Sequence, residues 1–359
     1  MANPIPNPQV EKLLALGVRN RWYPVAASWA VGQKPVGLTR LGERIVLWRD
    51  EAGQVHALED RCPHRGARLS LGWNLGDRVA CWYHGIEVGA DGTVVRVPAQ
   101  ESCPLEGERK VKSYPAFEQH NAIWAWFGDE LHAEPGKLEL PEELASPEWS
   151  SMLCTAHWKC NYGYAIDNVM DPMHGAYLHA RSHSMAMGDK TAVMRIVPTD
   201  QGFLFEKVGQ RGVNFDWVEW GESGALWMRL AIPYRKDAGP GGTFTIIGLV
   251  TPVDEHNCRV FFWRCRKVQD WQRDVWRFLY RTRLEGLHWE VLEQDRVVLE
   301  AMAADAREHE FLYQHDVGMT RVRRMLRQRA QQHFADLDAH RAQAAATAAE
   351  ANQAGHSHA

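Results

Sequence analysis

The sequence lacks several features that would assign it to a large functional class. No apolar run approaches the roughly 20 residues that a membrane-spanning helix needs. The start, MANPIPNPQVEKLL, lacks the basic and then apolar stretches of a signal peptide. Basic residues are not in excess, since the formal net charge is −4, so nothing indicates a surface that neutralises nucleic-acid phosphates. There is also no GxGxxG or other nucleotide loop. We therefore expect no membrane, no nucleic acid and no directly bound nucleotide.

Cysteine is scarce and odd in number, with seven residues in a chain of 359. An odd set scattered over a long chain is typical of reduced thiols rather than a disulfide framework. The composition, 45% hydrophobic and 24% charged, is that of an ordinary globular protein, and the length allows two domains. These features predict a cytoplasmic protein of two domains.

The pattern of residues changes along the chain. Short β-branched and aromatic runs bounded by turn residues predict a small all-β domain first, and a Pro- and Glu-rich connector follows. A helical stretch, a series of strands and a long helix near residues 269–307 then predict an α+β domain. We expect an N-terminal extension (1–17), an all-β domain (18–130), a linker (131–148), a second domain (149–330), and a tail that is helical and then Ala-rich and frayed (331–359).

Two mixed pairs of soft metal ligands lie close together in the all-β domain. The stretch CPHRGARLSLGWNLGDRVACWYH contains Cys62-x-His64 and Cys81-x-x-His84. Structural zinc favours a cysteine pair followed by a histidine pair. In a Rieske [2Fe–2S] centre, two histidines replace two cysteines on one of the two irons. One Cys and one His from each of two loops fit that arrangement, so the order favours a Rieske centre, with zinc as the alternative.

A second candidate metal site lies in AIDNVMDPMHGAYLH, which contains His174 and His179. Two imidazoles and one carboxylate form the facial triad that binds non-haem Fe(II). The two histidines are five residues apart, about 500° around an ideal helix, so they converge only where the helix is broken. Pro172 and Gly175 lie where such a break is expected. Without the first motif, two unrelated surface histidines would be the simpler interpretation.

The third ligand is predicted on the long helix, in LEGLHWEVLEQDRVVLEAM. The apolar positions of this helix are Leu284, Leu287, Val291, Val298 and Met302. Asp295 falls on the same face, where a carboxylate is costly unless it is paired or bound to a metal. Glu293 lies about 200° away and is expected to face solvent. A buried ion pair with an arginine is the alternative role for Asp295.

With both sites, the chain resembles the oxygenase component of the Rieske non-haem iron oxygenases. The matching patterns are C-x-H-x(15–17)-C-x2-H, D-N-x-x-D-P-x-H-x4-H and E-x-D-x-x-x-x-E, and the resemblance covers about residues 18 to 330. The order of parts is most similar to phthalate and phenoxybenzoate dioxygenases, dicamba monooxygenases and vanillate demethylases. The resemblance implies an α+β protein: an all-β Rieske domain, then a helix-grip catalytic domain in which an antiparallel sheet surrounds a cavity beside a long C-terminal helix.

The resemblance also assigns roles to residues. The positions that match the family's ligands are Cys62, His64, Cys81 and His84 for the cluster, and His174, His179 and Asp295 for the mononuclear iron. The two thiolates would share one cluster iron and the two imidazoles the other. Asp171 matches a carboxylate that links a Rieske histidine to the mononuclear site, and Asn168 matches a polar residue beside the iron.

The reaction implied by this resemblance is reductive activation of O2 at Fe(II), with NAD(P)H acting through a separate flavin- or ferredoxin-type reductase. The leading hypothesis is dihydroxylation of an aromatic carboxylate of the phthalate, benzoate or phenoxybenzoate type. The alternative is oxidative O-demethylation or methyl hydroxylation of an aromatic acid. An electron carrier with a vestigial second site is the alternative from another class. The family further implies a homotrimer in which the cluster of one protomer faces the mononuclear iron of its neighbour.

Candidates for the substrate pocket lie on the strands expected between residues 192 and 266. They are Arg211, Phe215, Trp217, Trp227, Arg229 and Arg235. The rings could pack against an aromatic substrate, and any arginine could pair with its carboxylate. Each arginine could also be a surface or ion-pair residue, so the acidic substrate rests mainly on the resemblance.

Overall fold

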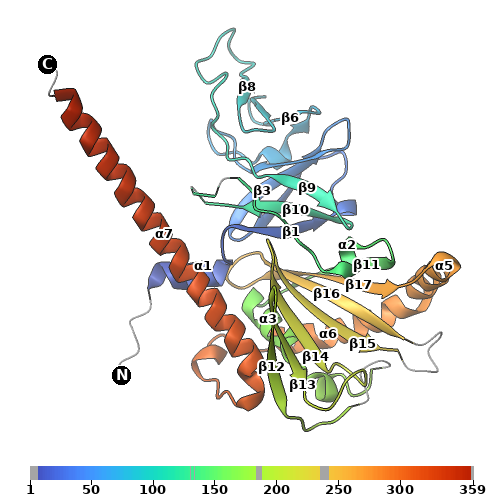
Figure 1. Cartoon of the computed structure of the whole chain (residues 1–359). Coiled ribbons are helices and arrows are strands. Elements are labelled where there is room, and N and C mark those ends of the chain that lie inside the picture. Colours follow the sequence, from blue (N-terminus) through green and yellow to red (C-terminus); the bar gives the residue numbers. More distant parts are fainter. Residues whose placement is uncertain (1–6, 130, 133, 183–187, 235–241, 357–359) are drawn as a thin grey trace.

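Two parts with different architectures share one interface in the structure, and a long C-terminal helix runs beside them (Figure 1). The computed structural model describes residues 7–129, 131–132, 134–182, 188–234 and 242–356. The N-terminal part is built from strands and the C-terminal part from one large sheet with helices. The predicted α+β class, an all-β domain followed by a sheet with a long C-terminal helix, is confirmed.

Three small antiparallel sheets form the described N-terminal part. Their strands, in spatial order, are β1 (Arg21–Ala27), β10 (Ala122–Phe127) and β9 (Ala116–Gln119); β2 (Val36–Arg40), β3 (Glu43–Arg49) and β4 (Val55–Glu59); and β5 (Trp73–Asn74), β6 (Arg78–Ala80), β7 (Glu87–Gly89) and β8 (Val94–Arg96). The sheet β5–β8 lies at the end of the molecule that is farthest from the large sheet (Figure 1).

Strand β10 explains why the two parts are held together. All six of its residues are buried, and successive side chains of a strand point to opposite faces. Trp124 and Trp126 join a core shared with the C-terminal sheet, whereas Ile123 and Phe127 join the core of the N-terminal part. The Trp124 ring stacks on that of Trp263, with centroids 5.8 Å apart and planes 10° apart. The continuous apolar run AIWAWF is therefore the signature of a strand that is covered on both faces.

The C-terminal part is built on an antiparallel seven-stranded sheet among the described residues. Its strands, in spatial order, are β11 (Trp149–Trp158), β17 (Cys258–Lys267), β16 (Thr243–Pro252), β15 (Leu226–Pro233), β14 (Trp217–Glu222), β13 (Gly202–Lys207) and β12 (Met194–Thr199). Strand β17 is buried on both faces. Phe261 and Trp263 face the N-terminal part, and Val260 and Phe262 face a core that the helices cover.

Helices cover the second face of this sheet. The α-helices of the described residues are α1 (Pro8–Leu16), α2 (Glu142–Ala145), α3 (Tyr162–Val169), α4 (Gly175–Leu178), α5 (Asp270–Leu279), α6 (Glu285–Glu300) and α7 (Val317–His356). Helix α2 is the exception, since its Leu144 joins the core that the sheet shares with the N-terminal part. A π-helical turn, Tyr280–Leu284, joins α5 to α6, and 3-10 turns occupy Ser28–Ala30, Leu69–Leu71, Ala306–Glu308 and Gln314–Asp316. The predicted long helix is thus present but ends at Glu300 rather than near residue 307.

Helix α7 is anchored to the body at its start and extends beyond it at its far end (Figure 1). Its first turns pack into the core through Val322 and Leu326, and Arg327 forms an ion pair with Glu11 of α1. The helix then continues to His356 and projects from the body (Figure 1). The fraying expected over about the last fifteen residues stays a prediction. None of the helices in the described part of the chain has both the length and the apolar composition needed to cross a membrane.

Candidate metal centres and the pocket beside them

Two loops at the tip of the N-terminal part bring the predicted cluster ligands together. Cys62 and His64 follow β4, and Cys81 and His84 lie between β6 and β7. The Nδ1 atoms of the two histidines are 3.2 Å apart, and the two cysteine thiols contact each other. The cysteines are buried and the histidines exposed. This arrangement places two sulfur donors inside the protein and two nitrogen donors at its surface.

The two loops have the same local geometry because each ends in a glycine. The Gly66 amide donates to the Cys62 carbonyl at 3.0 Å, and the Gly85 amide donates to the Cys81 carbonyl at 2.8 Å. Their φ angles are +74° and +72°, in the left-handed region that glycine adopts without a steric penalty. The segments CPHRG and CWYHG therefore form matching turns, each of which presents one cysteine and one histidine.

The donor set fits a Rieske [2Fe–2S] cluster, in which one iron has thiolate and the other imidazole ligands. Burial, followed by the neighbouring Cys81 thiol, raises the pKa of Cys62 to about 11. The metal-free protein therefore holds this cysteine as a thiol, and cluster assembly must release its proton.

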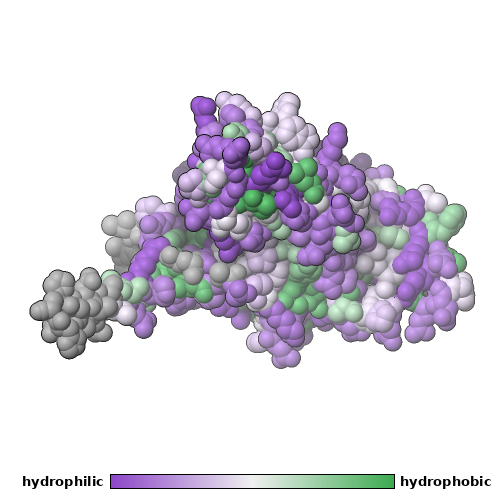
Figure 2. Space-filling model, turned by 90° about the horizontal axis from the view of Figure 1, so that it is seen from above, coloured by the Kyte–Doolittle hydropathy of each residue, from purple (hydrophilic) through white to green (hydrophobic). Residues whose placement is uncertain are grey.

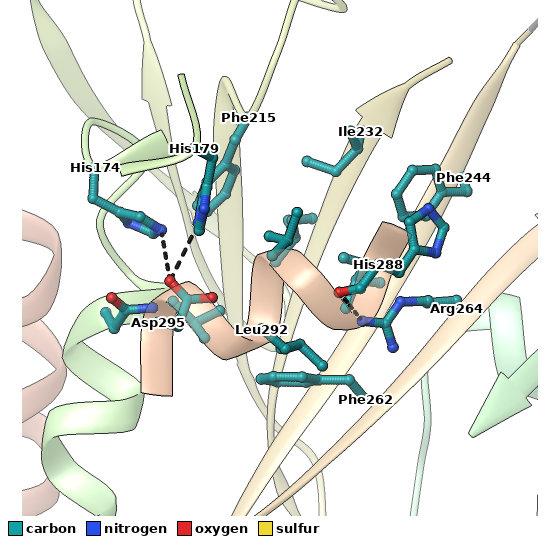
Figure 3. Close-up of a pocket in the computed structure, with 15 residues that line it drawn as sticks. His174, His179, Phe215, Ile232, Phe244, Phe262, Arg264, His288, Leu292 and Asp295 are labelled. Carbon is teal, nitrogen blue, oxygen red and sulfur yellow. Dashed lines mark hydrogen bonds and ion pairs between the residues drawn. The ribbon is translucent and has the colours of Figure 1, made fainter. Parts of the chain in front are cut away.

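The second group of predicted ligands converges from a broken helix and from α6 (Figure 3). As the sequence predicts, α3 ends at Val169 and α4 begins only at Gly175. The Nε2 atoms of His174 and His179 lie 3.5 Å and 3.2 Å from the same Asp295 oxygen, Oδ1. The ligand atoms of these three residues all lie within 4.8 Å of one another.

Hydrogen bonds on the far side of each imidazole set its tautomer. The Asp171 carbonyl oxygen lies 2.6 Å from Nδ1 of His174, and the Gln294 amide oxygen lies 2.7 Å from Nδ1 of His179. Both oxygens only accept, so each neutral imidazole carries its proton on Nδ1 and turns the Nε2 lone pair toward Asp295. Oδ1 of Asp295 is buried and has no hydrogen-bond partner in the described part of the chain.

Three electron-rich atoms that face one another in a buried site need a cation between them. A proton can play this part in the metal-free protein. Burial opposes the charged form of His179, but the Asp295 carboxylate and the Gln294 amide outweigh it and raise the pKa of this imidazole. Two imidazoles and one carboxylate form the donor set of a non-haem Fe(II) site, so the residues present fit a mononuclear iron.

Gln294 was not identified from the sequence, and its contact leads to a prediction. Gln294→Leu removes the acceptor that orients His179, and loss of such an outer contact typically lowers metal affinity about 10- to 100-fold. Gln294→Glu keeps an acceptor oxygen and should bind Fe(II) nearly as the wild type does. Anaerobic Fe(II) titration of the metal-free variants measures the difference. Equal affinities for the leucine variant and the wild type would show that Gln294 does not position this ligand.

A mostly apolar pocket opens beside the three converging residues. Its lining consists of Asn168, Val169, His174, His179, Phe215, Leu230, Ile232, Phe244, Ile246, Phe262, Arg264, His288, Val291, Leu292 and Asp295. The Phe215 ring lies edge-on to that of His174, with centroids 5.7 Å apart. The cavity volume is about 60 Å³, below the roughly 150 Å³ of an engineered cavity that holds benzene. An aromatic substrate therefore requires the lining side chains to move apart.

The other residues assigned from the sequence lie at different distances from this pocket. Asn168 lines it. Asp171 contributes its carbonyl to His174, and its Oδ1 accepts from the Met173 amide at 2.8 Å. Phe215 is the predicted pocket residue that does lie in the lining among the described residues.

Two of the predicted arginines are already paired elsewhere. Arg211 forms an ion pair with Glu206 at 3.3 Å and lies over the Trp217 ring. Arg229 forms an ion pair with Glu219 at 2.5 Å. Together with Trp217 they line a separate hollow, where neither reaches the metal ligands.

Trp227 and Arg235 complete the set of predicted pocket residues. Trp227 is buried in the core between the two parts, so it also lies away from the pocket. Arg235 lies outside the described residues.

Two pocket residues, Arg264 and His288, were not predicted. Arg264 follows Val260 and Phe262 at intervals of two along β17, so it lies on a strand face whose preceding residues are apolar. This could have identified it. His288 lies seven residues before Asp295 on α6, about two turns away and on the same face, so the helix periodicity could have indicated it.

Comparison with known families accounts for both parts of the chain. A model of the Rieske [2Fe-2S] domain matches residues 21–115. A model described as the vanillate O-demethylase oxygenase C-terminal domain matches residues 158–332. The cluster ligands lie within the first range, and His174, His179 and Asp295 lie within the second.

Individual proteins match about half or most of the chain. The vanillate O-demethylase oxygenase subunit of Pseudomonas sp. (strain HR199 / DSM 7063) is 37% identical over 182 residues, which are 51% of this chain and 51% of that protein. The oxygenase component of dicamba O-demethylase from Stenotrophomonas maltophilia is 29% identical over 309 residues, 79% of this chain and 88% of that protein. The crystal structure of dicamba monooxygenase bound to dicamba has 26% identity and a TM-score of 0.71, with 89% of this chain and 99% of that chain covered. The chain spans about half the length of the vanillate relative and of a toluene-4-sulfonate monooxygenase subunit from Comamonas testosteroni, 51% and 46% respectively.

Proposed function

Because this chain belongs to the Rieske non-haem iron oxygenases, as an oxygenase component, we propose that it inserts oxygen from O2 into an aromatic substrate. The observation that carries the proposal is the convergence of His174, His179 and Asp295 at an apolar pocket in a chain that also pairs two cysteines with two histidines. An electron carrier would need only the second of these features, so the intact three-residue site argues against a carrier with a vestigial second centre.

The residues of the chain divide the work between the two centres. When bound, the cluster supplies single electrons and the mononuclear Fe(II) supplies open positions for O2. His174, His179 and Asp295 would hold the iron, and the Asp171 carbonyl and Gln294 fix the two imidazoles. The apolar lining keeps water away from the reacting atoms. Asn168, in the lining, offers a polar group beside the iron.

Oxidative demethylation is the reaction that the relatives favour. The family model that matches the C-terminal part is named after vanillate O-demethylase. The dicamba relative is an O-demethylase that is similar to this chain along most of its length. The balanced reaction is R–O–CH3 + O2 + 2e− + 2H+ → R–OH + HCHO + H2O. Ring dihydroxylation, our leading hypothesis from the sequence, uses the same donor set. Carbazole 1,9a-dioxygenase, at 22% identity, shares the fold, which does not distinguish the two reactions.

The electrons are proposed to come from NAD(P)H through a separate reductase, since the sequence contains no nucleotide-binding motif.

We further propose a homotrimer in which the cluster loops of one protomer serve the iron of the next. Within one chain the loops around β6 lie far from α3 and α6 (Figure 1). From above, small hydrophobic areas interrupt a mostly hydrophilic surface (Figure 2). Trp82 and Tyr83, in the second cluster loop, are 65% and 58% exposed, as expected for an interface between copies. The free cysteines support a cytoplasmic location.

A single-turnover experiment tests the proposed reaction without the reductase. Iron-loaded protein with its cluster chemically reduced is mixed with O2 and a panel of methoxybenzoates, benzoates, phthalates and phenoxybenzoates. We expect a methoxybenzoate to give formaldehyde and the matching phenol in amounts that approach one per chain. A cis-diol from an unmethylated ring would instead support dihydroxylation. Reoxidation of the cluster with no oxygenated product from any member of the panel would contradict an oxygenase function for aromatic acids.

A further inference from the structure

Arg264 is a buried cation that has little within the protein to compensate it. This residue of β17 is 2% exposed, and it lines the pocket beside the metal ligands. Its Nε and Nη1 atoms are buried without a hydrogen-bond partner among the described residues. Nη2 makes one long contact, 3.4 Å, to the carbonyl oxygen of His288. No acidic side chain in the described ranges forms an ion pair with it, so its charge is unbalanced.

Burial without an ion-pair partner is unusual for a guanidinium. Burial of an ionised group without a partner is strongly unfavourable, and an arginine cannot relieve it by losing its proton. Other arginines in the same sheet are compensated, since Arg229 pairs with Glu219 and Arg195 with Glu206. Arg264 differs from them in that its unused donors belong to a pocket. An anionic ligand in that pocket would complete its hydrogen bonds and its charge.

The position of Arg264 defines where such an anion would lie. Figure 3 shows Asp295 near one end of α6, and Arg264 with His288 near the other. His288 and Asp295 are seven residues apart, which is about 10.5 Å along the helix axis. A hydrogen bond to Arg264 takes up about 2.9 Å of such a span. A span of this order suits one aromatic ring with a short substituent, once the side chains that line the cavity of about 60 Å³ move apart.

Aromatic side chains line the space between these two ends. Phe244 stacks on the His288 ring with centroids 4.5 Å apart, and Phe262 and Leu292 lie along the middle of the lining (Figure 3). Rings and aliphatic groups at this position favour a flat apolar body. The pocket thus has three zones in line: metal ligands, an apolar middle and a cationic end.

We propose that Arg264 binds the oxyanion of the substrate, a carboxylate or a sulfonate on a single aromatic ring, and so directs the opposite end of the ring toward the iron. This assignment rests on the proposed function and narrows its substrate class. In this role Arg264, which lies in the pocket, replaces the arginines that the sequence suggested for binding a substrate carboxylate. Arg264 is a substrate-binding residue here, and it takes no part in the chemistry at the iron.

Equilibrium binding to the Fe(II)-loaded protein without O2 tests the proposal. The probes are 4-methoxybenzoate and 4-methylbenzenesulfonate, each matched with its neutral amide, 4-methoxybenzamide and 4-methylbenzenesulfonamide. Calorimetry should show that the wild type prefers at least one acid over its amide. In Arg264→Met that acid should bind about 10- to 100-fold more weakly, because charge-assisted hydrogen bonds are lost, while the amide keeps its affinity. Arg264→Lys, which keeps the charge but not the fork of donors, should lie between them.

Two controls separate binding from structure. Arg211→Met removes a half-exposed arginine outside the pocket and should leave the preference for the acid unchanged. The melting temperature of Arg264→Met should equal or exceed that of the wild type, because an unbalanced buried charge is removed. A large loss of stability together with an unchanged preference for the acid would assign Arg264 a structural role and overturn the proposal.

The remaining outcomes also decide the question. Equal affinity of the wild type for each acid and its amide, or no binding of any of the four probes, overturns the proposal. Oxygen uptake then tests the proposed function separately. Acids that bind through Arg264 but are never oxidised would leave the binding site standing and contradict the oxygenase function. Oxidation of neutral aromatic compounds alone would support the oxygenase function and contradict the binding site for an anion.

Discussion

Asp295→Ala is expected to abolish substrate oxidation and to remove the mononuclear iron, while the visible spectrum of the Rieske cluster stays normal. Asp295 supplies the one carboxylate of the three-residue site, and its Oδ1 lies within 3.5 Å of both imidazoles. Without it, two neutral histidines remain, a much weaker ligand set for Fe(II). The cluster ligands lie in the other part of the chain and are unaffected. Iron content, the cluster spectrum and substrate-dependent O2 uptake of the purified variant measure the three effects.

Glu293→Ala is the matched control for this substitution. Glu293 precedes Asp295 by two residues, but its side chain is 57% exposed and forms an ion pair with Arg296. An exposed pair of this kind contributes little to stability, so the variant should retain its iron and its activity. If Glu293→Ala loses the mononuclear iron and Asp295→Ala keeps it, the assignment of the carboxylate ligand is wrong.

Mixed oligomers should recover activity that neither parent has. A Cys81→Ala chain keeps His174, His179 and Asp295 but loses a cluster ligand, and an Asp295→Ala chain has the opposite defect. Each alone should be inactive. In a cyclic trimer that contains both chains, one of the three directed interfaces joins an intact cluster site to an intact iron site, so roughly one third of wild-type activity is expected.

Separate affinity tags on the two chains allow the mixed oligomers to be purified, and metal analysis verifies that both remaining sites are loaded. A mixture of the two parent oligomers, prepared separately, is the control and should stay inactive. Loaded mixed oligomers that remain at background would show that electrons pass within one chain. The proposed arrangement, in which the cluster loops of one protomer serve the iron of the next, would then fail.

The sequence predicted correctly that Asp295 is buried, but it predicted less well which other residues share the buried face of the helix. The expected apolar stripe included Val298 and Met302, which are 41% and 43% exposed. The buried positions of α6 are His288, Leu292, Asp295 and Leu299. Asp295 belongs both to the face expected from the sequence and to the buried face of α6, because the two faces overlap. A helix with polar residues on its buried face, as a metal site requires, gives a misleading apolar pattern, and the error is largest at its C-terminal end.

The substrate pocket was less predictable than the metal ligands because sheet strands carry two buried faces. Trp227 on β15 packs between the two parts, whereas Leu230, three residues later on the same strand, lines the pocket. Phe215, which also lines the pocket, lies in the loop before β14. Alternation along a strand gives the relative orientation of its residues but not which face meets the cavity. Ligand motifs such as CPH and CWYHG carry their geometry locally, and short-range spacing was sufficient for them. The pocket depends on the pairing of distant strands, which one sequence does not reveal.

Iron and acid-labile sulfide analysis of the purified, reconstituted protein tests the central claim most directly, since the claim is that one chain holds both centres. The account predicts about three irons and about two sulfides per chain, with a visible and EPR spectrum of a Rieske cluster. Asp295→Ala should retain about two of each. A protein that takes up zinc at Cys62, His64, Cys81 and His84, or that binds about two irons in the wild type and in Asp295→Ala alike, would contradict it.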